Sequence, residues 1–128
     1  MTSSRQSLGM WGEALAADFL MQLGYSIIGR NVRTPYGEID LVVCQDMASS
    51  PVIVMVEVKT RSSTKFGFPE EAVSHRKKEH LVNSAQAFMQ AHPELGGNWR
   101  IDVIAIQKSG GDSEPSIEHF VNAVNQGN

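Results

Sequence analysis

Cysteine, long apolar segments and positive charge are all scarce in this sequence. It contains a single cysteine, Cys44, which excludes a disulfide framework and fits the reducing cytoplasm. Within its apolar surroundings, Cys44 is expected to be a small buried hydrophobe. No apolar run reaches the roughly 18 residues that a membrane-spanning helix needs, and residues 1–6 lack the apolar segment of a secretory signal. These absences favour a cytoplasmic protein that does not enter a membrane.

Positive charge is in deficit overall but concentrated in one stretch. The 11 Lys and Arg residues are outnumbered by 14 Asp and Glu residues, giving a net charge of −3, which is not the basic footprint of a tight nucleic-acid binder. Six of the 11 nevertheless lie within one short segment: Lys59, Arg61, Lys65, Arg76, Lys77 and Lys78. This segment is suited to contacting phosphates, and it is equally consistent with a solvated loop and helix surface.

The length and the order of the apolar patterns predict one α/β domain. The chain has 128 residues, of which 41% are hydrophobic, enough for one domain over residues 1–128 with frayed termini. Apolar residues at helical spacing predict two helices, Gln6–Leu23 and Pro69–His92. Runs rich in β-branched residues predict five strands: Tyr25–Arg33, Gly37–Val43, Val52–Lys59, Trp99–Ile106 and Ile117–Val124. The order α-β-β-β-α-β, followed by an edge strand, predicts a mixed sheet flanked by helices.

Three charged residues interrupt the two strands that should form a hairpin. Asp40 lies within Gly37–Val43, and Glu57 and Lys59 lie at the end of Val52–Lys59. Burying an unpaired charge is costly, so these charges need partners. Glu57 and Lys59 share one face of their strand because side chains alternate, and strand pairing can bring Asp40 beside them. The sequence therefore predicts that two carboxylates and one ammonium group meet at one place on the sheet.

This combination of side chains suits metal-dependent hydrolysis of a phosphodiester. Carboxylate oxygens are preferred ligands of Mg²⁺ and Mn²⁺, and Mg²⁺ is usually held by one or two carboxylates together with waters and substrate phosphates. Such a metal ion lowers the pKa of a bound water, and a nearby lysine can orient that water. A purely structural ion network is the alternative, although buried ion pairs stabilise a core poorly compared with apolar residues.

Six short blocks, taken in order, carry a resemblance to a known family. The blocks are Gly12-Glu13-Ala14, Asn31-Val32-Arg33, Gly37-Glu38-Ile39-Asp40-Leu41, Val56-Glu57-Val58-Lys59, Phe66-Gly67 and Lys77. They resemble the PD-(D/E)xK nuclease superfamily and, within it, the YraN-like family, which is similar to archaeal Holliday-junction resolvases. The resemblance extends from about Leu8 to about Ala123. Ile39 stands where proline precedes the aspartate in the superfamily pattern, a departure that the superfamily tolerates.

The resemblance implies a restriction-endonuclease-like core and a Mg²⁺- or Mn²⁺-dependent endonuclease that cuts DNA, with branched or junction DNA as the candidate substrate. It implies that Asp40 and Glu57 bind the metal ion and that the Val58 carbonyl is a further ligand. Lys59 would position the attacking water. By itself Glu13 is typical of a surface glutamate, whereas the resemblance implies that it contributes to the metal site. Similar enzymes are often dimers, so a homodimer is also implied, although the sequence has no clear dimer seam.

Six basic residues are the candidates for contacts with nucleic acid: Arg33, Arg61, Lys65, Arg76, Lys77 and Lys78. Lys77 aligns with a lysine of the family and is a candidate for contacting either a phosphate or the catalytic edge. A nucleic-acid-binding or adaptor protein that keeps the fold without turnover is the alternative function, which the acidic net charge favours. Asp102, in a later strand, is expected to pair with Arg100 or with a loop backbone rather than to act in catalysis.

Overall fold

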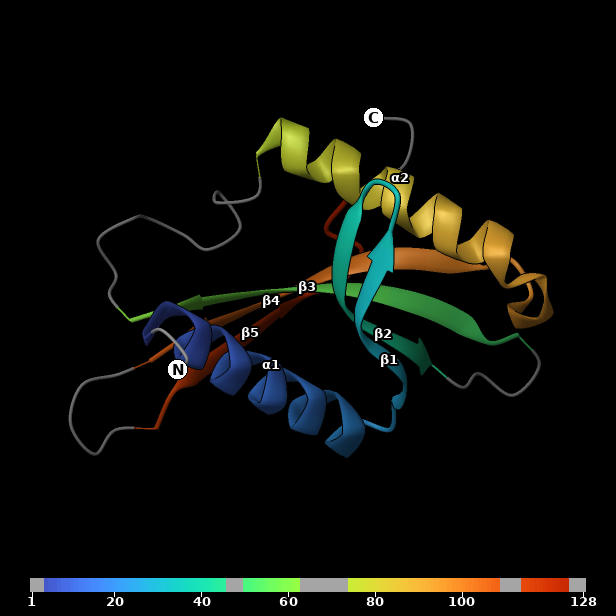
Figure 1. Cartoon of the computed structure of the whole chain (residues 1–128). Coiled ribbons are helices and arrows are strands. Elements are labelled where there is room, and N and C mark those ends of the chain that lie inside the picture. The colour runs from blue at the N-terminus through green and yellow to red at the C-terminus, as the bar shows by residue number, and fades with distance from the viewer. Residues whose placement is uncertain (1–3, 46–49, 63–73, 109–113, 125–128) are drawn as a thin grey trace.

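The computed structural model describes residues 4–45, 50–62, 74–108 and 114–124. Helix α1 lies on one face of a five-stranded sheet and α2 on the other (Figure 1). The elements in chain order are α1 (Ser4–Gln22), β1 (Ser26–Thr34), β2 (Gly37–Gln45), β3 (Val52–Arg61), α2 (His75–Ala91), the short 3₁₀ helix η2 (Pro93–Leu95), β4 (Trp99–Gln107) and β5 (Ser116–Phe120). The predicted α/β class and the α-β-β-β-α-β order are confirmed, with β5 as the edge strand.

The sheet is mixed, with the spatial order β1-β2-β3-β4-β5. The β1–β2, β2–β3 and β4–β5 pairs are antiparallel, and β3 and β4 are parallel. Helix α2 makes the crossover between the two parallel strands, which cannot be joined by a tight turn. Strand β3 is central in the sheet, so side chains near its end can be reached from several other elements.

Each face of the sheet has its own apolar core. The core on the α1 face consists of buried residues from α1, β2, β3 and β4: Ala16, Ala17, Leu20, Leu41, Val43, Val54, Val56, Ile104 and Ile106. The core on the α2 face contains Ile39, Val42, Ile53, Met55, Leu81, Ala85, Phe88, Ile101, Val103 and Val124. Strands β3 and β4 are covered on both faces, which is why their sequences are nearly continuous apolar runs. A charged residue within either run therefore becomes a buried charge.

Strand β2 leaves β3 before β3 ends. The antiparallel ladder between them stops at Leu41 and Val56, whereas β2 stays paired with β1 as far as Gly37. The β1–β2 hairpin bends toward α2 (Figure 1), and Thr34 Oγ1 at its tip lies 3.1 Å from Ser84 Oγ of that helix. This separation opens a space beside the second half of β3.

The start of α2 lies later in the chain than predicted. The helix begins at His75, and Ser74 before it is extended and caps it; the predicted start, Pro69, lies outside the described ranges. The Ser74 hydroxyl accepts a hydrogen bond from Lys77 N–H at 3.1 Å, which satisfies one of the free amides of the first turn. The cap at Ser74 therefore sets the start of α2 at His75.

Strand β5 ends at Phe120 instead of the predicted Val124. Asn122 has a φ of 54°, a left-handed conformation that cannot continue an extended strand. The chain then turns back to the sheet, where Ala123 N–H donates to Ile101 O at 2.9 Å. Val124 is thereby buried in the core on the α2 face.

Three further predictions concern the remainder of the chain. No helix within the four described ranges is long and apolar enough to cross a membrane. Cys44 is half-buried and packs against the core on the α2 face. The predicted fraying concerns residues 1–3 and 125–128, and the predicted nucleic-acid contact of Lys65 falls within residues 63–73. All of these residues lie outside the described ranges.

Candidate functional site

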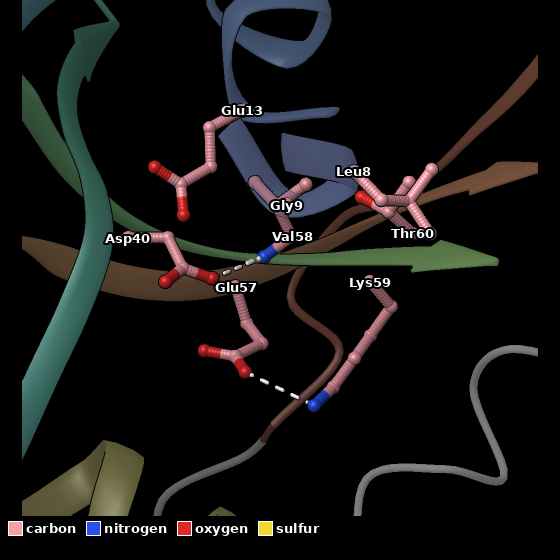
Figure 2. Close-up of a pocket in the computed structure, with 8 residues that line it drawn as sticks. All are labelled: Leu8, Gly9, Glu13, Asp40, Glu57, Val58, Lys59 and Thr60. Atoms are coloured by element: carbon pink, nitrogen blue, oxygen red, sulfur yellow. Dashed lines mark hydrogen bonds and ion pairs between the residues drawn. The ribbon is translucent and has the colours of Figure 1, made fainter. Parts of the chain in front are cut away.

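Asp40 lies on β2 just beyond the point where β2 and β3 separate. Its Oδ2 accepts a hydrogen bond from Val58 N–H at 2.8 Å (Figure 2). The β2–β3 ladder no longer reaches Val58, so its amide takes the carboxylate as acceptor, as a backbone donor of a central strand must find some partner. The backbone of β3 thus fixes the position of the Asp40 side chain.

Glu57 is the buried charge of β3, with a side chain only 5% exposed. Its Oε1 lies 3.2 Å from Lys59 Nζ and 3.4 Å from Lys77 Nζ, so α2 supplies the second of two ammonium groups. Its Oε2 is buried and has no hydrogen-bond partner among the described residues. A buried carboxylate oxygen without a partner is uncommon in native proteins and calls for an explanation.

Glu13 reaches the site from α1, and its partner is a residue to which the sequence analysis gave no role. Figure 2 shows the Glu13 carboxylate directed toward Asp40. Asn31 Nδ2 donates to Glu13 Oε1 at 3.0 Å and to Glu38 Oε1 at 3.1 Å. Asn31 has a φ of 49°, a conformation in which asparagine is enriched. An asparagine inside a strand, two residues after Gly29, is the sequence signal that marks this irregular position.

Negative charge accumulates around Asp40. Burial raises the pKa of Asp40, and the neighbouring Glu57 carboxylate raises it further. The hydrogen bond from Val58 N–H opposes both effects, and Glu13 adds to them, so that the pKa moves from 3.8 to about 7. At neutral pH this carboxylate consequently favours a proton or a cation beside it.

The carboxylates line a pocket of about 380 Å³, here called the carboxylate pocket. Its lining residues are Leu8, Gly9, Glu13, Asp40, Glu57, Val58, Lys59 and Thr60. Within the part of the chain that the structure describes, no three His, Cys, Asp or Glu side chains are gathered tightly enough to enclose a metal ion by themselves. Asp40 and Glu57 still fit Mg²⁺ or Mn²⁺, because these ions commonly complete their shells with waters and substrate oxygens. The Glu57 oxygen without a partner is the atom that a cation would satisfy.

Helix α1 approaches β3 closely at Gly12. A Cβ added to this residue would clash with Thr60 Oγ1 and would lie 3.0 Å from Thr60 Cβ. Thr60 is β-branched, so rotating its side chain does not clear the space. The absence of a side chain at position 12 therefore lets α1 lie close enough to the sheet for Glu13 to reach the carboxylate pocket.

The Gly12→Ala substitution is expected to destabilise the protein by about 1–3 kcal/mol, the usual cost of overpacking. An alanine in an exposed helix would instead be more stable than glycine by up to about 1 kcal/mol. Urea denaturation measures the difference, with Gly9→Ala as the matched control, because a Cβ at Gly9 meets no atom within 4 Å. Equal stability of the two variants would contradict the close approach, and adding Thr60→Ala to Gly12→Ala should recover part of the loss.

The other predicted nucleic-acid-binding residues in the described ranges do not line the carboxylate pocket. Arg33 has a side chain that is 90% exposed and lies 3.9 Å from Glu38 Oε2. Arg61 is half-buried at the end of β3, and Arg76 and Lys78 are exposed on the first turn of α2. Of these predicted contacts, the structure thus brings Lys77 beside Glu57, whereas Arg33, Arg61, Arg76 and Lys78 lie outside the lining of the pocket.

Asp102 is fully buried and belongs to a separate network. Arg100 donates to its two oxygens at 2.9 and 3.2 Å, as predicted, and also to Tyr25 Oη at 2.8 Å. His119 Nε2 lies 2.7 Å from Asp102 Oδ2, and Asn122 N–H donates to Oδ1 at 2.9 Å. Burial acts to raise the pKa of Asp102, but the hydrogen bonds from His119 and Arg100 outweigh it and lower the pKa. This network links Tyr25, which precedes β1, to β4 and to residues at and just after the end of β5, and it has a structural role.

Comparison with known proteins identifies close relatives. A family model described as "Uncharacterised protein family UPF0102" matches residues 12–106. A UPF0102 protein of Syntrophomonas wolfei is 45% identical over 118 residues, which are 92% of this chain and 97% of the relative. A UPF0102 protein of Syntrophotalea carbinolica is 39% identical over 123 residues, covering 96% of this chain and 95% of the relative. A UPF0102 protein of Roseiflexus castenholzii is 41% identical over 128 residues, covering 98% of this chain and 99% of the relative.

Proposed function

The chain belongs to the UPF0102 family, the YraN-like family that the sequence blocks indicated, and we propose that it is a metal-dependent endonuclease that hydrolyses DNA phosphodiester bonds. One observation carries the proposal. A buried glutamate, Glu57, has one oxygen held by two ammonium groups and the other without a hydrogen-bond partner in the described structure. Asp40, whose pKa is raised to about 7, lies beside it.

The carboxylates are suited to holding the metal ion. Asp40 and Glu57 would bind Mg²⁺ or Mn²⁺, with the Val58 carbonyl and Glu13 as further contributors, and the ion would supply a water of lowered pKa and stabilise the charge that develops on the phosphate. Asp40 Oδ2 is already oriented by Val58 N–H, which leaves Oδ1 for another contact. Glu13 is restrained by Asn31, so both acidic side chains are held in position before substrate binds, as effective catalysis requires.

The lysines supply positive charge on the other side of Glu57. Lys59 Nζ is held 3.2 Å from Glu57 Oε1, where it can orient the attacking water and offset negative charge on the phosphate. Lys77 Nζ lies 3.4 Å from the same oxygen, and in the proposed complex it contacts a neighbouring phosphate oxygen. In the proposed reaction the water oxygen bonds to phosphorus in line with the leaving sugar oxygen while the water gives up a proton to the surrounding solvent. The bond to the sugar oxygen breaks, and that oxygen takes up a proton from solvent. Similar enzymes leave a 5′-phosphate end, and the same product is expected here.

The experiment that tests this function is cleavage of labelled single-stranded, duplex, flap and four-way-junction DNA with Mg²⁺ or Mn²⁺. Lys59→Ala is expected to lower the cleavage rate by about 100-fold or more, the size of effect seen on removing one preorganised electrostatic contact. Arg30→Ala is the control, because Arg30 is an exposed cation of β1 that does not line the carboxylate pocket. Absence of cleavage on every substrate, or equal rates for wild type and Lys59→Ala, would refute the proposal.

A nucleic-acid-binding or adaptor protein without turnover is the second candidate. The observation that favours it is the position of Lys59 and Lys77, which can neutralise Glu57 in the absence of a metal ion. Thermal unfolding with and without millimolar Mn²⁺ separates the two functions, since a ligand that binds only the native state raises the Tm by mass action. The endonuclease requires a rise in Tm with Mn²⁺, whereas the adaptor gives none and retains salt-dependent binding to DNA.

A further inference from the structure

A second pocket of about 380 Å³ lies next to the carboxylate pocket. It is lined by Ser7, Leu8, Trp11, Ser62 and Lys108, and we call it the Trp11 pocket. These residues come from the first turns of α1 and from the positions that follow β3 and β4. Leu8 lines both pockets, so they are neighbours along α1. None of the three carboxylates of the first pocket lines the second.

The Trp11 pocket combines a fixed aromatic ring with a movable positive charge. Trp11 is half-buried and packs against the core on the α1 face, which restrains the ring. Lys108 Nζ lies 5.6 Å from the centroid of that ring, within the range of a cation–π contact. The backbone of Lys108 is anchored, since its N–H donates to Arg61 O at 2.7 Å, but its side chain is exposed. An exposed lysine can therefore leave the ring without disturbing the fold.

These features match the parts of one nucleotide. Aromatic side chains stack on nucleobases whatever their sequence, because every base has a π face. An ammonium group suits the phosphate that joins the base to its neighbour. The hydroxyls of Ser7 and Ser62 can donate or accept a hydrogen bond, so they accommodate different base edges. A volume of about 380 Å³ is also within the range of pockets that bind small molecules.

We propose that the Trp11 pocket binds an unpaired nucleobase next to the phosphodiester that is cut. The base lies against the Trp11 ring in place of the Lys108 ammonium group, and Lys108 turns to the adjoining phosphate. The proposal rests on the endonuclease function, because it takes the phosphodiester beside the pocket to be the one that is cut. The proposal assigns DNA with an unpaired nucleotide as the substrate class, since a base stacked in an intact duplex cannot offer its face to a side chain. Strands with an unpaired nucleotide beside the cut, at a flap, branch or single-stranded end, are therefore bound in preference to blunt duplex.

Tryptophan fluorescence tests the binding step without catalysis. The chain has two tryptophans, Trp11 and Trp99, and Trp99 packs against the opposite core, so a Trp99→Phe protein has Trp11 as its sole tryptophan. Adding single-stranded oligothymidylate in EDTA is expected to quench Trp11 emission, and blunt duplex is expected to bind at least about 5-fold more weakly, since unpaired bases are the ones that stack. Unchanged emission while fluorescence anisotropy shows the labelled oligonucleotide bound would overturn the proposal, as would the absence of any binding.

Three side-chain variants test the roles of the ring and the ammonium group. Trp11→Leu is expected to weaken the affinity for oligothymidylate by about 10-fold to 100-fold, and Trp11→Phe by less, because it keeps a stacking surface. Since Trp11 also packs on the core, Lys108→Met provides a test that leaves the core intact. It should lower the slope of log affinity against log salt concentration by about 1. Arg30→Met, exposed on β1 and outside both pockets, is expected to leave the slope unchanged.

Failure of this inference can be told apart from failure of the proposed function. Quenching of Trp11 together with no cleavage of any substrate would support the pocket and refute the endonuclease. Metal-dependent cleavage with the same substrate preference in wild type, Trp11→Leu and Lys108→Met would support the endonuclease and refute the pocket. Where both hold, Trp11→Leu lowers the cleavage of flaps and single strands more than it lowers the cleavage of duplex.

Discussion

Replacing Asp40 with asparagine is expected to stabilise the metal-free protein at pH 8, by as much as about 4 kcal/mol. Burial and the Glu57 carboxylate raise the pKa of Asp40 from 3.8 to about 7, and each pH unit of difference corresponds to about 1.4 kcal/mol. Asparagine removes the charge but keeps an oxygen that can accept the hydrogen bond from Val58 N–H. The variant therefore loses the cost of the buried charge and retains the contact that positions the side chain.

The pH dependence gives this prediction its sign. Because the pKa is raised in the folded state, ionised Asp40 opposes folding. The cost is absent below the unfolded pKa near 4, grows as the pH rises toward about 7, and stays constant above that value. Urea denaturation in EDTA should thus show Asp40→Asn to be more stable than wild type at pH 8, with the two converging near pH 4. An Asp40→Asn protein that is less stable than wild type at pH 8 would contradict the account.

Metal binding should stabilise the wild type selectively at neutral pH. Mn²⁺ is expected to raise the Tm of the wild type, because the ion offsets the charge that Asp40 and Glu57 hold together. It should leave the Tm of Asp40→Asn nearly unchanged. Asp18→Asn is the control, since Asp18 is exposed on α1 and does not line the carboxylate pocket, and it should respond to Mn²⁺ as the wild type does.

Replacing Glu57 with glutamine is expected to reduce DNA cleavage by at least about 100-fold, a loss comparable to that of one preorganised electrostatic group. The substitution keeps the shape of the side chain but leaves Lys59 and Lys77 without the carboxylate that holds them at 3.2 and 3.4 Å. It also removes the negative charge from the oxygen that has no partner among the described residues. One substitution therefore changes both the ion pairs of the two lysines and the negative charge available to a metal ion.

Cleavage rates at saturating substrate and the Tm shift with Mn²⁺ measure the two consequences separately. Glu57→Gln should lose both, whereas Lys77→Ala should lose cleavage only in part and keep the Tm shift. Glu118→Gln, an exposed residue of β5, serves as the control for loss of one carboxylate. Cleavage by Glu57→Gln at a rate within a few-fold of wild type would remove Glu57 from the proposed mechanism.

The parts of the fold that were predictable depend on local patterns. The apolar runs of β3 and β4 identify strands that are covered on both faces, and the charges that interrupt β3 identify the site. The convergence of Asp40, Glu57 and Lys59 follows from the alternation of side chains and the pairing of consecutive strands. Where local signals compete, as between Pro69 and Ser74 for the start of α2, the sequence does not decide the outcome.

The remaining features depend on how the elements pack. The contact of Lys77 with Glu57 requires the position of α2 over the sheet, and the contact of Asn31 with Glu13 requires the position of α1. By contrast, the pairing of Asp102 with Arg100 can be predicted from the sequence, because the two residues are close together in one strand. Its contact with His119 depends on the arrangement of β4 and β5. Short-range spacing carries no information about such distances.

The hydrogen bond between Val58 N–H and Asp40 makes a single backbone amide a spectroscopic reporter of the site. The resonance frequency of an amide proton responds to the charge on its acceptor, so the Val58 cross-peak in a ¹H–¹⁵N spectrum should move when Asp40 gains a proton, meets a cation or becomes asparagine. Its movement during a titration would give the occupancy of the carboxylate directly. The state of the site can thus be followed in a protein to which no substrate has been added.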